Sequence, residues 1–420
     1  MNNKKGNVLA IGIMFFLFAM ISFVTGLQNP MGIIAKAQFG ATNLMSQLGN
    51  AANFIAYAFM GLPAGFLLKG KGYKFTALAA VSVGFIGVGI SYLSGVVESF
   101  PVYLLGAFVS GFSMCMLNTV VNPLLNTLGG GGNKGNQLIQ LGGSLNSLSA
   151  TIVPVLAGYL IGEVTAQTQV ADVNLALFTA MGIFALAFVI ILFSYIPEPE
   201  LEAAAAAGEQ KKESTLESIK GALSHKNLVF GVIAIFLYVG IEVGIPNVAN
   251  LYMTSADGLG LAAGVAGSLV GAYWFLMLVG RLVGSVIGGK VSSKAMMVAV
   301  SSAAILFLLL GIYLPKTVTM TLLEAQVPVA ILFFVLCGLC TSVMWGAVFN
   351  LAVEGLGKYT SIASGLFMVM VCGGGLLPLL QGAVAEKNNV PAIIDKRIQR
   401  AIIDAISCSS LILFVIRIFF

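Results

Sequence analysis

Apolar stretches of about 20 residues recur along this chain, and they constrain its fold more than any other feature. Each is long enough to cross a hydrocarbon core of about 30 Å as an α-helix, which satisfies its own backbone hydrogen bonds within lipid. Hydrophobic residues make up 58% of the 420 positions and charged residues 9%, a balance that soluble domains do not have. The sequence therefore predicts an all-α polytopic membrane protein.

We count twelve spans in the sequence. Their predicted bounds are 8–28, 47–68, 75–95, 101–128, 137–163, 173–196, 227–253, 261–289, 295–314, 327–354, 362–385 and 403–420. The first has too long an apolar run for a cleaved signal and lacks a small-residue cleavage site, so we expect a retained helix.

Lysine and arginine predict the orientation, because short loops rich in them stay in the cytoplasm. With the N-terminus inside, the outer loops before residue 386 hold only Lys36 and Lys316, and the cytoplasmic segments hold many more lysines. We therefore expect a bacterial cytoplasmic (inner) membrane protein with both termini in the cytoplasm. One segment, 386–404, disagrees, since it carries four basic residues on the side predicted to be outside. The net charge of +5 follows from this topology and calls for no nucleic-acid partner.

The longest polar interruption, from Pro197 to Asn227, divides the chain into two halves. We predict a six-helix bundle over 1–196, a cytoplasmic linker with a short helix over 197–226, and a second six-helix bundle over 227–420. The halves resemble each other at matching places: Leu128-Gly129 follows the fourth span and Leu356-Gly357 follows the tenth. Parallel six-helix repeats are typical of transporters whose substrate site lies at the midplane between the halves.

Polar side chains inside the spans indicate where a cavity lies, because unpaired polar groups in hydrocarbon cost energy. They are amides, hydroxyls and aromatic rings, which suit a neutral ligand with many hydroxyl groups. On the fifth span, Asn136, Gln140 and Ser147 share a helical face by their spacing. The alternative is that such groups tie helices together by hydrogen bonds. The predicted substrate-binding residues are Gln28, Asn29, Asn118, Asn122, Gln140, Asn146, Asn247, Tyr273, Trp274 and Asn350.

Glu242 is the one carboxylate deep within a predicted span, and we interpret it as a candidate for proton or cation coupling. A structural acid bonded to a neighbouring helix is the alternative. Arg281 is the nearest plausible partner, yet counting inward at 1.5 Å per residue places it roughly 8 Å shallower. We therefore do not expect these two residues to pair.

The sequence does not predict an enzyme. The stretch "GGGGNKGN" from Gly129 lacks the spacing of a phosphate-binding loop, and we interpret it as a turn. The single histidine, His225, has no acid or cysteine at metal-ligand spacing. We expect no cofactor and no metal site, apart from a coupling Na⁺ or H⁺, and we expect a monomer in the bilayer.

Four stretches now resemble the major facilitator superfamily, and within it the fucose–galactose–glucose:proton symporter family. They are "GLPAGFLLKGKGYK" (61–74), "NTVVNPLLNTLG" (118–129) with "QLGGSLNSL" (140–148), "FLYVGIEVGI" (236–245), and "MWGAVFNLAVEGLG" with "GGGLLPLLQG" (344–357, 373–382). The resemblance implies two six-helix bundles related by a pseudo-two-fold axis. The loop after the second span is similar to the signature G-x-x-x-D-[RK]-x-G-[RK]-[RK], with Lys69 in place of the acid. We assign gating roles to Gly65, Lys69 and Lys74, and to Arg281.

The resemblance also implies roles for individual residues. Asn122 and Asn146 match positions that help to form the sugar cavity, and Glu242 matches an acid common in the seventh span. Proton-coupled members carry acids at the positions of Asn29 and Asn118, so both usual proton carriers are amides here. We predict an importer of a neutral hexose-type sugar (glucose, galactose or fucose) that works by alternating access and is cation-coupled. An uncoupled facilitator, or an efflux carrier for another small solute, is the alternative.

Overall fold

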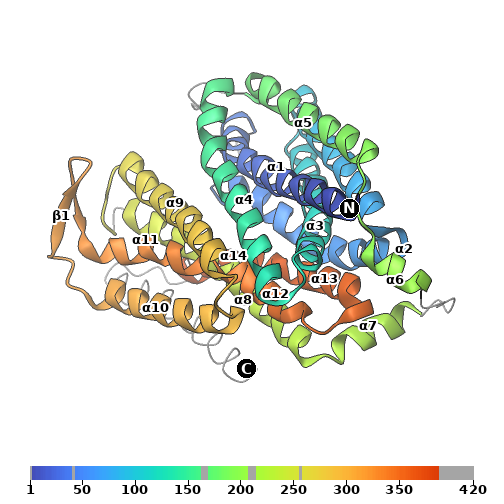
Figure 1. The fold of residues 1–420 in the computed structure, drawn as a ribbon. Helices are drawn as coiled ribbons and strands as arrows, with labels where there is room; N and C mark the ends of the chain where they lie inside the picture. Colours follow the sequence, from blue (N-terminus) through green and yellow to red (C-terminus); the bar gives the residue numbers. More distant parts are fainter. Residues whose placement is uncertain (1, 40–42, 162–168, 207–213, 255–257, 387–420) are drawn as a thin grey trace.

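The computed structural model describes residues 2–39, 43–161, 169–206, 214–254 and 258–386, and within these ranges the fold is helical apart from one hairpin (Figure 1). A first set of helices comprises α1 (Asn2–Gln38), α2 (Asn43–Val96), α3 (Phe100–Leu128), α4 (Gly132–Ile161), the short helix η1 (Val170–Val173) and α5 (Asn174–Phe193). Two linker helices follow, α6 (Pro199–Ala206) and α7 (Thr215–Leu223).

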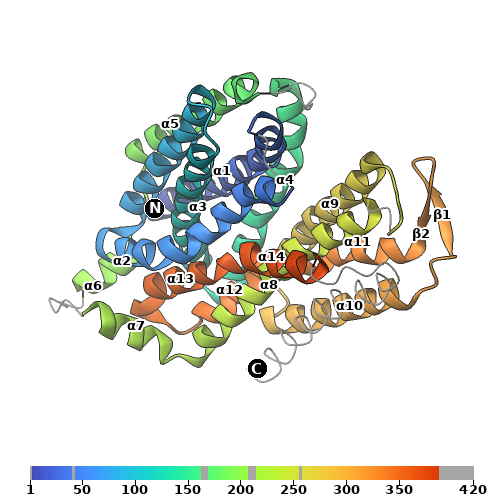
Figure 2. The same cartoon turned by 180° about the vertical axis from the view of Figure 1, so that it is seen from behind.

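A second set begins with α8 (Lys226–Thr254), α9 (Ala263–Ile287) and α10 (Ser293–Tyr313). The antiparallel strands β1 (Thr319–Leu322) and β2 (Ala325–Pro328) come next. The remaining elements are α11 (Val329–Thr341), α12 (Met344–Val353), η2 (Gly357–Tyr359), α13 (Thr360–Val369), η3 (Met370–Cys372) and α14 (Gly373–Glu386). Figures 1 and 2 show α1–α5 lying together and α9–α11 lying together with the hairpin at their far edge.

The predicted spans up to 362–385 fall on helices of the described residues. Those on α1 and α4, the first and the fifth, are not among the described segments that have the length and hydropathy of a membrane span. Eight segments of the described residues are long and apolar enough to cross a membrane. One of them, Leu48–Val96, contains the second and third predicted spans. The tenth predicted span is formed by α11 with α12, and the eleventh by α13, η3 and α14. The last predicted span, 403–420, and the basic segment 386–404 lie outside the described residues, apart from Glu386 at the end of α14.

Two features of the structure go beyond the sequence prediction. The predicted linker helix is in fact a pair, α6 and α7, and Ser214 with Glu217 forms a capping box at the start of α7. The connection after α10, expected as a plain loop, contains the β1–β2 hairpin. Its alternating threonines, Thr319 and Thr321, favour an extended conformation.

Glycines bring the helices of the first set into close contact. A Cβ atom at Gly111 of α3 would lie 2.5 Å from the carbonyl oxygen of Asn53 on α2. This is closer than real Cβ atoms approach a backbone, so α2 and α3 pack here only because residue 111 is glycine. Membrane helices gain stability from such close packing, since lipid offers no hydrophobic force between them.

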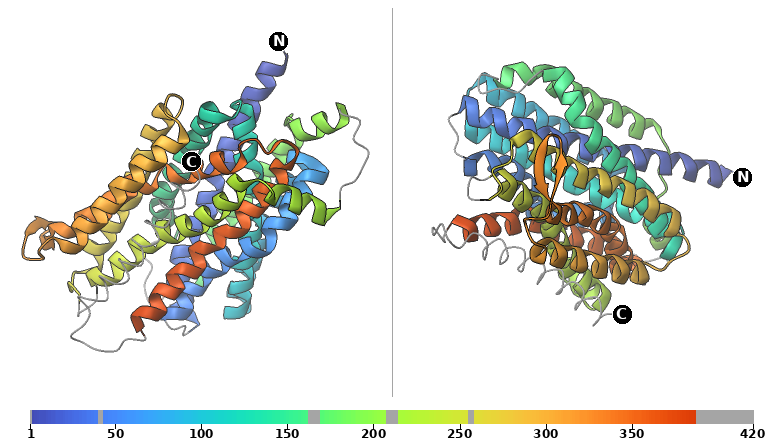
Figure 3. Two further views of the ribbon diagram at one scale, coloured as in Figure 1. Left: turned by 90° about the horizontal axis from the view of Figure 1, so that it is seen from below. Right: turned by 90° about the vertical axis from the view of Figure 1, so that its left-hand side faces the viewer.

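The two sets meet along α2 with α13 and along α4 with α9. At the first contact, a Cβ at Gly365 would lie 2.6 Å from the carbonyl oxygen of Gly61 and 2.8 Å from the Cα of Gly65. Figure 3 shows α13 and α14 running alongside α2. We call the end of the molecule where residues 69–74 contact α6 and α7 the linker end.

The close approach at Gly111 predicts a difference between two Gly→Ala variants. Gly111→Ala should lower the melting temperature in detergent, because the methyl group pushes α3 away from α2. Gly182→Ala on α5 should leave it unchanged or raise it, because nothing lies within 4 Å of that position and alanine favours a helix by about 1 kcal/mol. Equal melting temperatures for both variants would contradict the packing argument.

Candidate functional site

Arg281 of α9 lies at the contact between the two sets, and each of its guanidinium nitrogens donates a hydrogen bond. Nη1 donates to the Gly143 carbonyl at 3.1 Å, to Asn146 Oδ1 at 3.4 Å and to Ser147 Oγ at 2.8 Å, all on α4. Nε donates to the Ser342 carbonyl at 3.3 Å. Since α4 belongs to the first set and Ser342 to the second, this one cation connects them.

Arg281 also forms an ion pair with Glu242 of α8, with 3.3 Å between Nη2 and Oε1. The two side chains are 10% and 12% exposed, so the pair is largely out of solvent. Breaking such a pair by removing one partner leaves an uncompensated buried charge. Each of the two charges can therefore stay buried only while the other is present.

The expectation that Arg281 and Glu242 do not pair is wrong. Side chains on a helix tilt toward its N-terminus. The consecutive helices α8 and α9 run in opposite directions, so Glu242 leans toward the linker end and Arg281 leans away from it. These opposite tilts bring the two charged groups to a similar depth, although the Cα positions counted along the helix axes differ in depth.

A ladder of three asparagines, Asn118, Asn122 and Asn126, follows α3 at a spacing of four residues. Asn118 Nδ2 donates to the Tyr57 hydroxyl at 3.1 Å, and Asn122 Nδ2 donates to the Asn118 carbonyl at 2.9 Å. Asn118 and Asn122 are buried. A spacing of four residues places the three amides on one face of α3, where they point in a common direction.

Asn122 and Asn126 of this ladder are bonded to α12 of the second set. Trp345 Nε1 donates to Asn122 Oδ1 at 3.1 Å, and Asn126 Nδ2 donates to Asn350 Oδ1 at 2.7 Å. Asn122 and Asn350 occupy equivalent places, six residues before Leu128 and Leu356 respectively. Each therefore offers its amide oxygen to a donor on the opposite set.

The polar face predicted for the fifth span is confirmed on α4. Asn136, Gln140, Ser144 and Ser147 are buried, whereas Leu141 and Leu148 are exposed. Gln140 Nε2 donates to the Val343 carbonyl of the second set at 2.7 Å. Asn146 Nδ2 donates to the Phe18 carbonyl of α1 at 2.8 Å, which places its oxygen toward Arg281.

Aromatic side chains of the second set surround Glu242. The Tyr273 hydroxyl donates to the Glu242 carbonyl at 3.1 Å and lies 3.1 Å from Thr341 Oγ1. The Tyr238 hydroxyl donates to the Thr341 carbonyl, also at 3.1 Å. These bonds fix both rings beside the ion pair.

Not every predicted binding residue joins this buried group. Asn247 on α8 is exposed, and Trp274 on α9 is 36% exposed with its ring edge-on to Tyr273. The side chains of Gln28 and Asn29 lie outside the described side chains. The buried group thus gathers Asn118, Asn122, Gln140, Tyr273 and Asn350 from the prediction, with half-buried Asn146 at its edge, together with Glu242 and Arg281.

The structure adds residues that the sequence prediction did not name as site residues. Tyr57, Asn126 and Trp345 each bond to a predicted residue. The signal for Asn126 was present, since it follows Asn122 by four residues. Tyr57 has no such signal, because its contact joins α2 to α3 across 61 positions.

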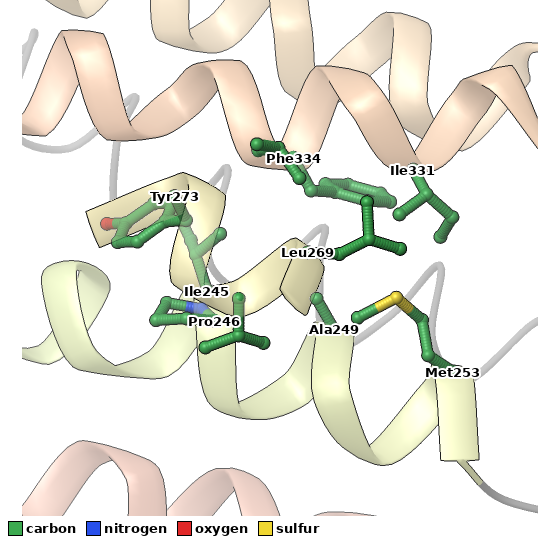
Figure 4. Close-up of a pocket in the computed structure, with 10 residues that line it drawn as sticks. Ile245, Pro246, Ala249, Met253, Leu269, Tyr273, Ile331 and Phe334 are labelled. Atoms are coloured by element: carbon green, nitrogen blue, oxygen red, sulfur yellow. The ribbon is translucent and has the colours of Figure 1, made fainter. Parts of the chain in front are cut away.

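An apolar hollow lies beside this group in the second set (Figure 4). Figure 4 shows the Tyr273 ring at one end of the hollow, with its hydroxyl pointing away from the other labelled side chains. The lining comes from α8, α9 and α11, namely Ile245, Pro246, Ala249, Met253, Leu269, Val270, Tyr273, Ile331, Phe334 and Val335. The lining is apolar, and the volume of about 10 Å³ has room for about one water molecule.

The predicted gating residues lie at or near the linker end. Gly65 packs against Gly365, and a Cβ there would lie 3.0 Å from the Gly365 Cα. Lys69 Nζ donates to Ser218 Oγ of α7 at 2.7 Å. Lys74 Nζ donates to the Leu192 and Ser194 carbonyls, each at 2.9 Å, at the end of α5.

Comparisons with known proteins agree with this architecture. The sequence profile of the Major Facilitator Superfamily matches residues 12–378. A glucose/galactose transporter of Brucella abortus biovar 1 (strain 9-941) is 28% identical over 388 residues, covering 92% of this chain and 90% of the relative. The L-fucose-proton symporter of Escherichia coli (strain K12) is 21% identical over 398 residues, covering 90% and 86%.

Solved structures show the same fold. The crystal structure of the transporter FucP in the outward conformation superposes with a TM-score of 0.78 at 19% identity, covering 99% of both chains. The proton:xylose symporter XylE bound to 6-bromo-6-deoxy-D-glucose gives a TM-score of 0.74 at 14% identity, covering 98% of this chain and 95% of that one.

The ion pair predicts a non-additive effect on stability. Arg281→Met should destabilise the protein by about 3 to 5 kcal/mol, because it leaves the Glu242 carboxylate buried without a cation. Adding Glu242→Gln should recover part of that loss, since no charge then remains. Thermal unfolding in detergent measures both. A double variant less stable than Arg281→Met would show that the ion pair does not govern this site.

Proposed function

The chain belongs to the Major Facilitator Superfamily, and we propose that it carries a neutral hexose-type sugar across the cytoplasmic membrane by alternating access. The observation that supports this most is the composition of the buried group between the two sets. It consists of amides and hydroxyls with a single compensated ion pair. Each amide offers a donor and an acceptor together, which is what a ligand made of hydroxyl groups requires.

The aromatic ring of Tyr273 suits the same class of substrate. A pyranose ring presents apolar C–H faces as well as hydroxyls, and flat or aliphatic side chains can cover them. Tyr273 borders the hollow and bonds to the Glu242 carbonyl beside the ion pair. The relatives named as glucose/galactose transporters and as L-fucose-proton symporters favour a hexose within this class.

The described conformation is the state closed at the linker end. The hydrogen bonds from Trp345 to Asn122 and from Asn126 to Asn350 both join α3 to α12. The second of them lies close to the C-terminal ends of both helices. The bond from Gln140 to the Val343 carbonyl joins α4 to the second set near the same end. The similarity to a structure in the outward conformation supports this assignment.

Alternating access then has a simple chemical basis in this protein. In the closed state each of Asn122, Gln140 and Asn350 has a partner on the opposite set. These partners are the Trp345 indole, the Val343 carbonyl and the Asn126 amide, respectively. When the sets separate at the linker end, these amides lose their partners and must bond to something else. Sugar hydroxyls on their way through the cavity are suitable replacements, and water follows when the sugar leaves.

We propose that transport is coupled to a cation and that Glu242 takes part in the coupling. Its ion pair with Arg281 connects directly to Asn146 and Ser147 of the first set, so a change in the charge of Glu242 reaches the contact between the sets. Protonation or a bound Na⁺ would weaken the electrostatic attraction between Glu242 and Arg281.

An uncoupled facilitator, or an efflux carrier for another small solute, is the second candidate. It is favoured by Asn118, which stands where proton-coupled members carry an acid.

The topology proposed here places both termini and the linker end in the cytoplasm of a bacterium. The bundles comprise residues 1–196 and 227–420, joined by the linker 197–226, with twelve spans in all. Packing supports the first boundary, since α1 to α5 contact one another and α6 and α7 lie between the sets in sequence.

Uptake by proteoliposomes tests the substrate and the coupling together. We expect labelled glucose, galactose or fucose to accumulate when an inward sodium or proton gradient is imposed, and Glu242→Gln to abolish the accumulation. Equilibration without either gradient would instead identify the facilitator. Failure to move any of the three sugars would contradict the proposed substrate class.

The placement of the site predicts which amides matter. Asn122→Ala and Asn146→Ala should each lower uptake by roughly tenfold or more, because each loses a hydrogen-bonding group at the contact between the sets. Asn227→Ala, at the start of α8 and away from these contacts, is the matched control and should transport normally. Normal uptake by both site variants would show that the cavity lies elsewhere.

A further inference from the structure

The linker helix α6 is anchored to the first set through Glu198. Its carboxylate accepts hydrogen bonds from two successive backbone N–H groups, those of Tyr73 at 2.6 Å and Lys74 at 2.8 Å. These amides are free to donate because α2 is interrupted at Gly72, whose φ of 82° and ψ of −179° suit glycine alone. The interruption creates a helix N-terminus, and such an end favours a carboxylate.

The next acid along the chain, Glu200 in the first turn of α6, contacts both sets. Oε1 accepts a hydrogen bond from the Tyr73 hydroxyl at 2.9 Å. Oε2 accepts one from the hydroxyl of Ser361, in the first turn of α13. One carboxylate is therefore shared between α2 of the first set and α13 of the second.

This shared carboxylate lies beside the glycine contact between α2 and α13. A Cβ at Gly65 would lie 3.0 Å from the carbonyl oxygen of Ser361, the residue that donates to Glu200. If α13 moves away from α2, Tyr73 and Ser361 separate, and Glu200 loses one of its two donors. The bond to Glu200 is thus available only while the linker end is closed.

Burial makes Glu200 dependent on these donors. It raises the pKa of the Glu200 carboxyl, and the hydrogen bonds from Ser361 and Tyr73 oppose the rise. Hydrogen bonds to a charged acceptor are stronger than those between neutral groups.

The sequence also carries Lys69 where the superfamily signature has an acid, and the structure brings linker carboxylates to this loop.

We propose that Glu200 is a clasp that holds the linker end closed by binding Tyr73 of α2 and Ser361 of α13 together, with Glu198 anchoring α6 in place. The linker is then a working part of the conformational cycle and sets the balance between the two states. The clasp rests on the proposed alternating access. Glu200 would stabilise the closed state without contacting the substrate.

Distance measurements between the two sets test the clasp without any sugar. Spin-labelled amino acids at Lys71 and Glu354, both exposed at the linker end, report the separation of the sets in the protein in lipid nanodiscs. Glu200→Ala should shift the ratio of open to closed populations by roughly tenfold toward the open state, as loss of a charge-assisted hydrogen bond predicts. Ser361→Ala should shift the ratio in the same direction. If Glu200→Ala fails to fold, the Ser361→Ala variant alone tests the clasp.

Two further variants make the outcome unambiguous. Glu202→Ala removes an exposed carboxylate from the same helix and should leave the distances unchanged. Gly65→Leu should open the linker end by wedging α2 from α13. If Gly65→Leu opens it while Glu200→Ala and Ser361→Ala do not, the clasp is wrong and alternating access stands. If Gly65→Leu also leaves the distances unchanged, the proposed opening at this contact is itself overturned.

Discussion

A polar group within a bilayer needs a partner inside the protein, and in this chain many of the partners lie on the opposite set of helices. Asn122 bonds to Trp345, Asn126 to Asn350, and Gln140 to the Val343 backbone, each across the contact between the sets. These residues are costly in lipid because they need hydrogen-bond partners. For the same reason, their bonds across the contact hold the two sets together. It also limits how the sets can separate, because each bond that breaks must be replaced by water or by substrate.

Arg281 shows this principle with a full charge. Its guanidinium bonds to Ser147 and Asn146 of the first set, and to Glu242 and the Ser342 carbonyl of the second. A buried ion pair of this kind contributes little net stability over an apolar replacement, yet breaking it is costly. Its value to a carrier is that two sets of helices share one charge, so that a change at Glu242 is felt by both.

The linker shows the same requirement for partners outside the predicted spans. Glu198 binds the backbone of α2 where Gly72 interrupts the helix, and Glu200 bonds to side chains of both sets. These bonds lie at the surface end of the glycine contact between α2 and α13. The polar contacts within the membrane and those of the linker thus act in the same direction, and both are satisfied in the conformation described.

Local composition was sufficient to predict the helical membrane architecture, the buried face of α4 and the helical linker, because length, hydropathy and spacing along one helix determine them. The resemblance of short stretches indicated the superfamily and singled out Asn122, Asn146 and Glu242. Tertiary structure decided the pairing of Arg281 with Glu242, the bond from Asn126 to Asn350, and the sharing of Glu200 between Tyr73 and Ser361. These contacts join residues distant in sequence, and they depend on helix direction and side-chain lean, which the spacing of residues along a single helix does not encode.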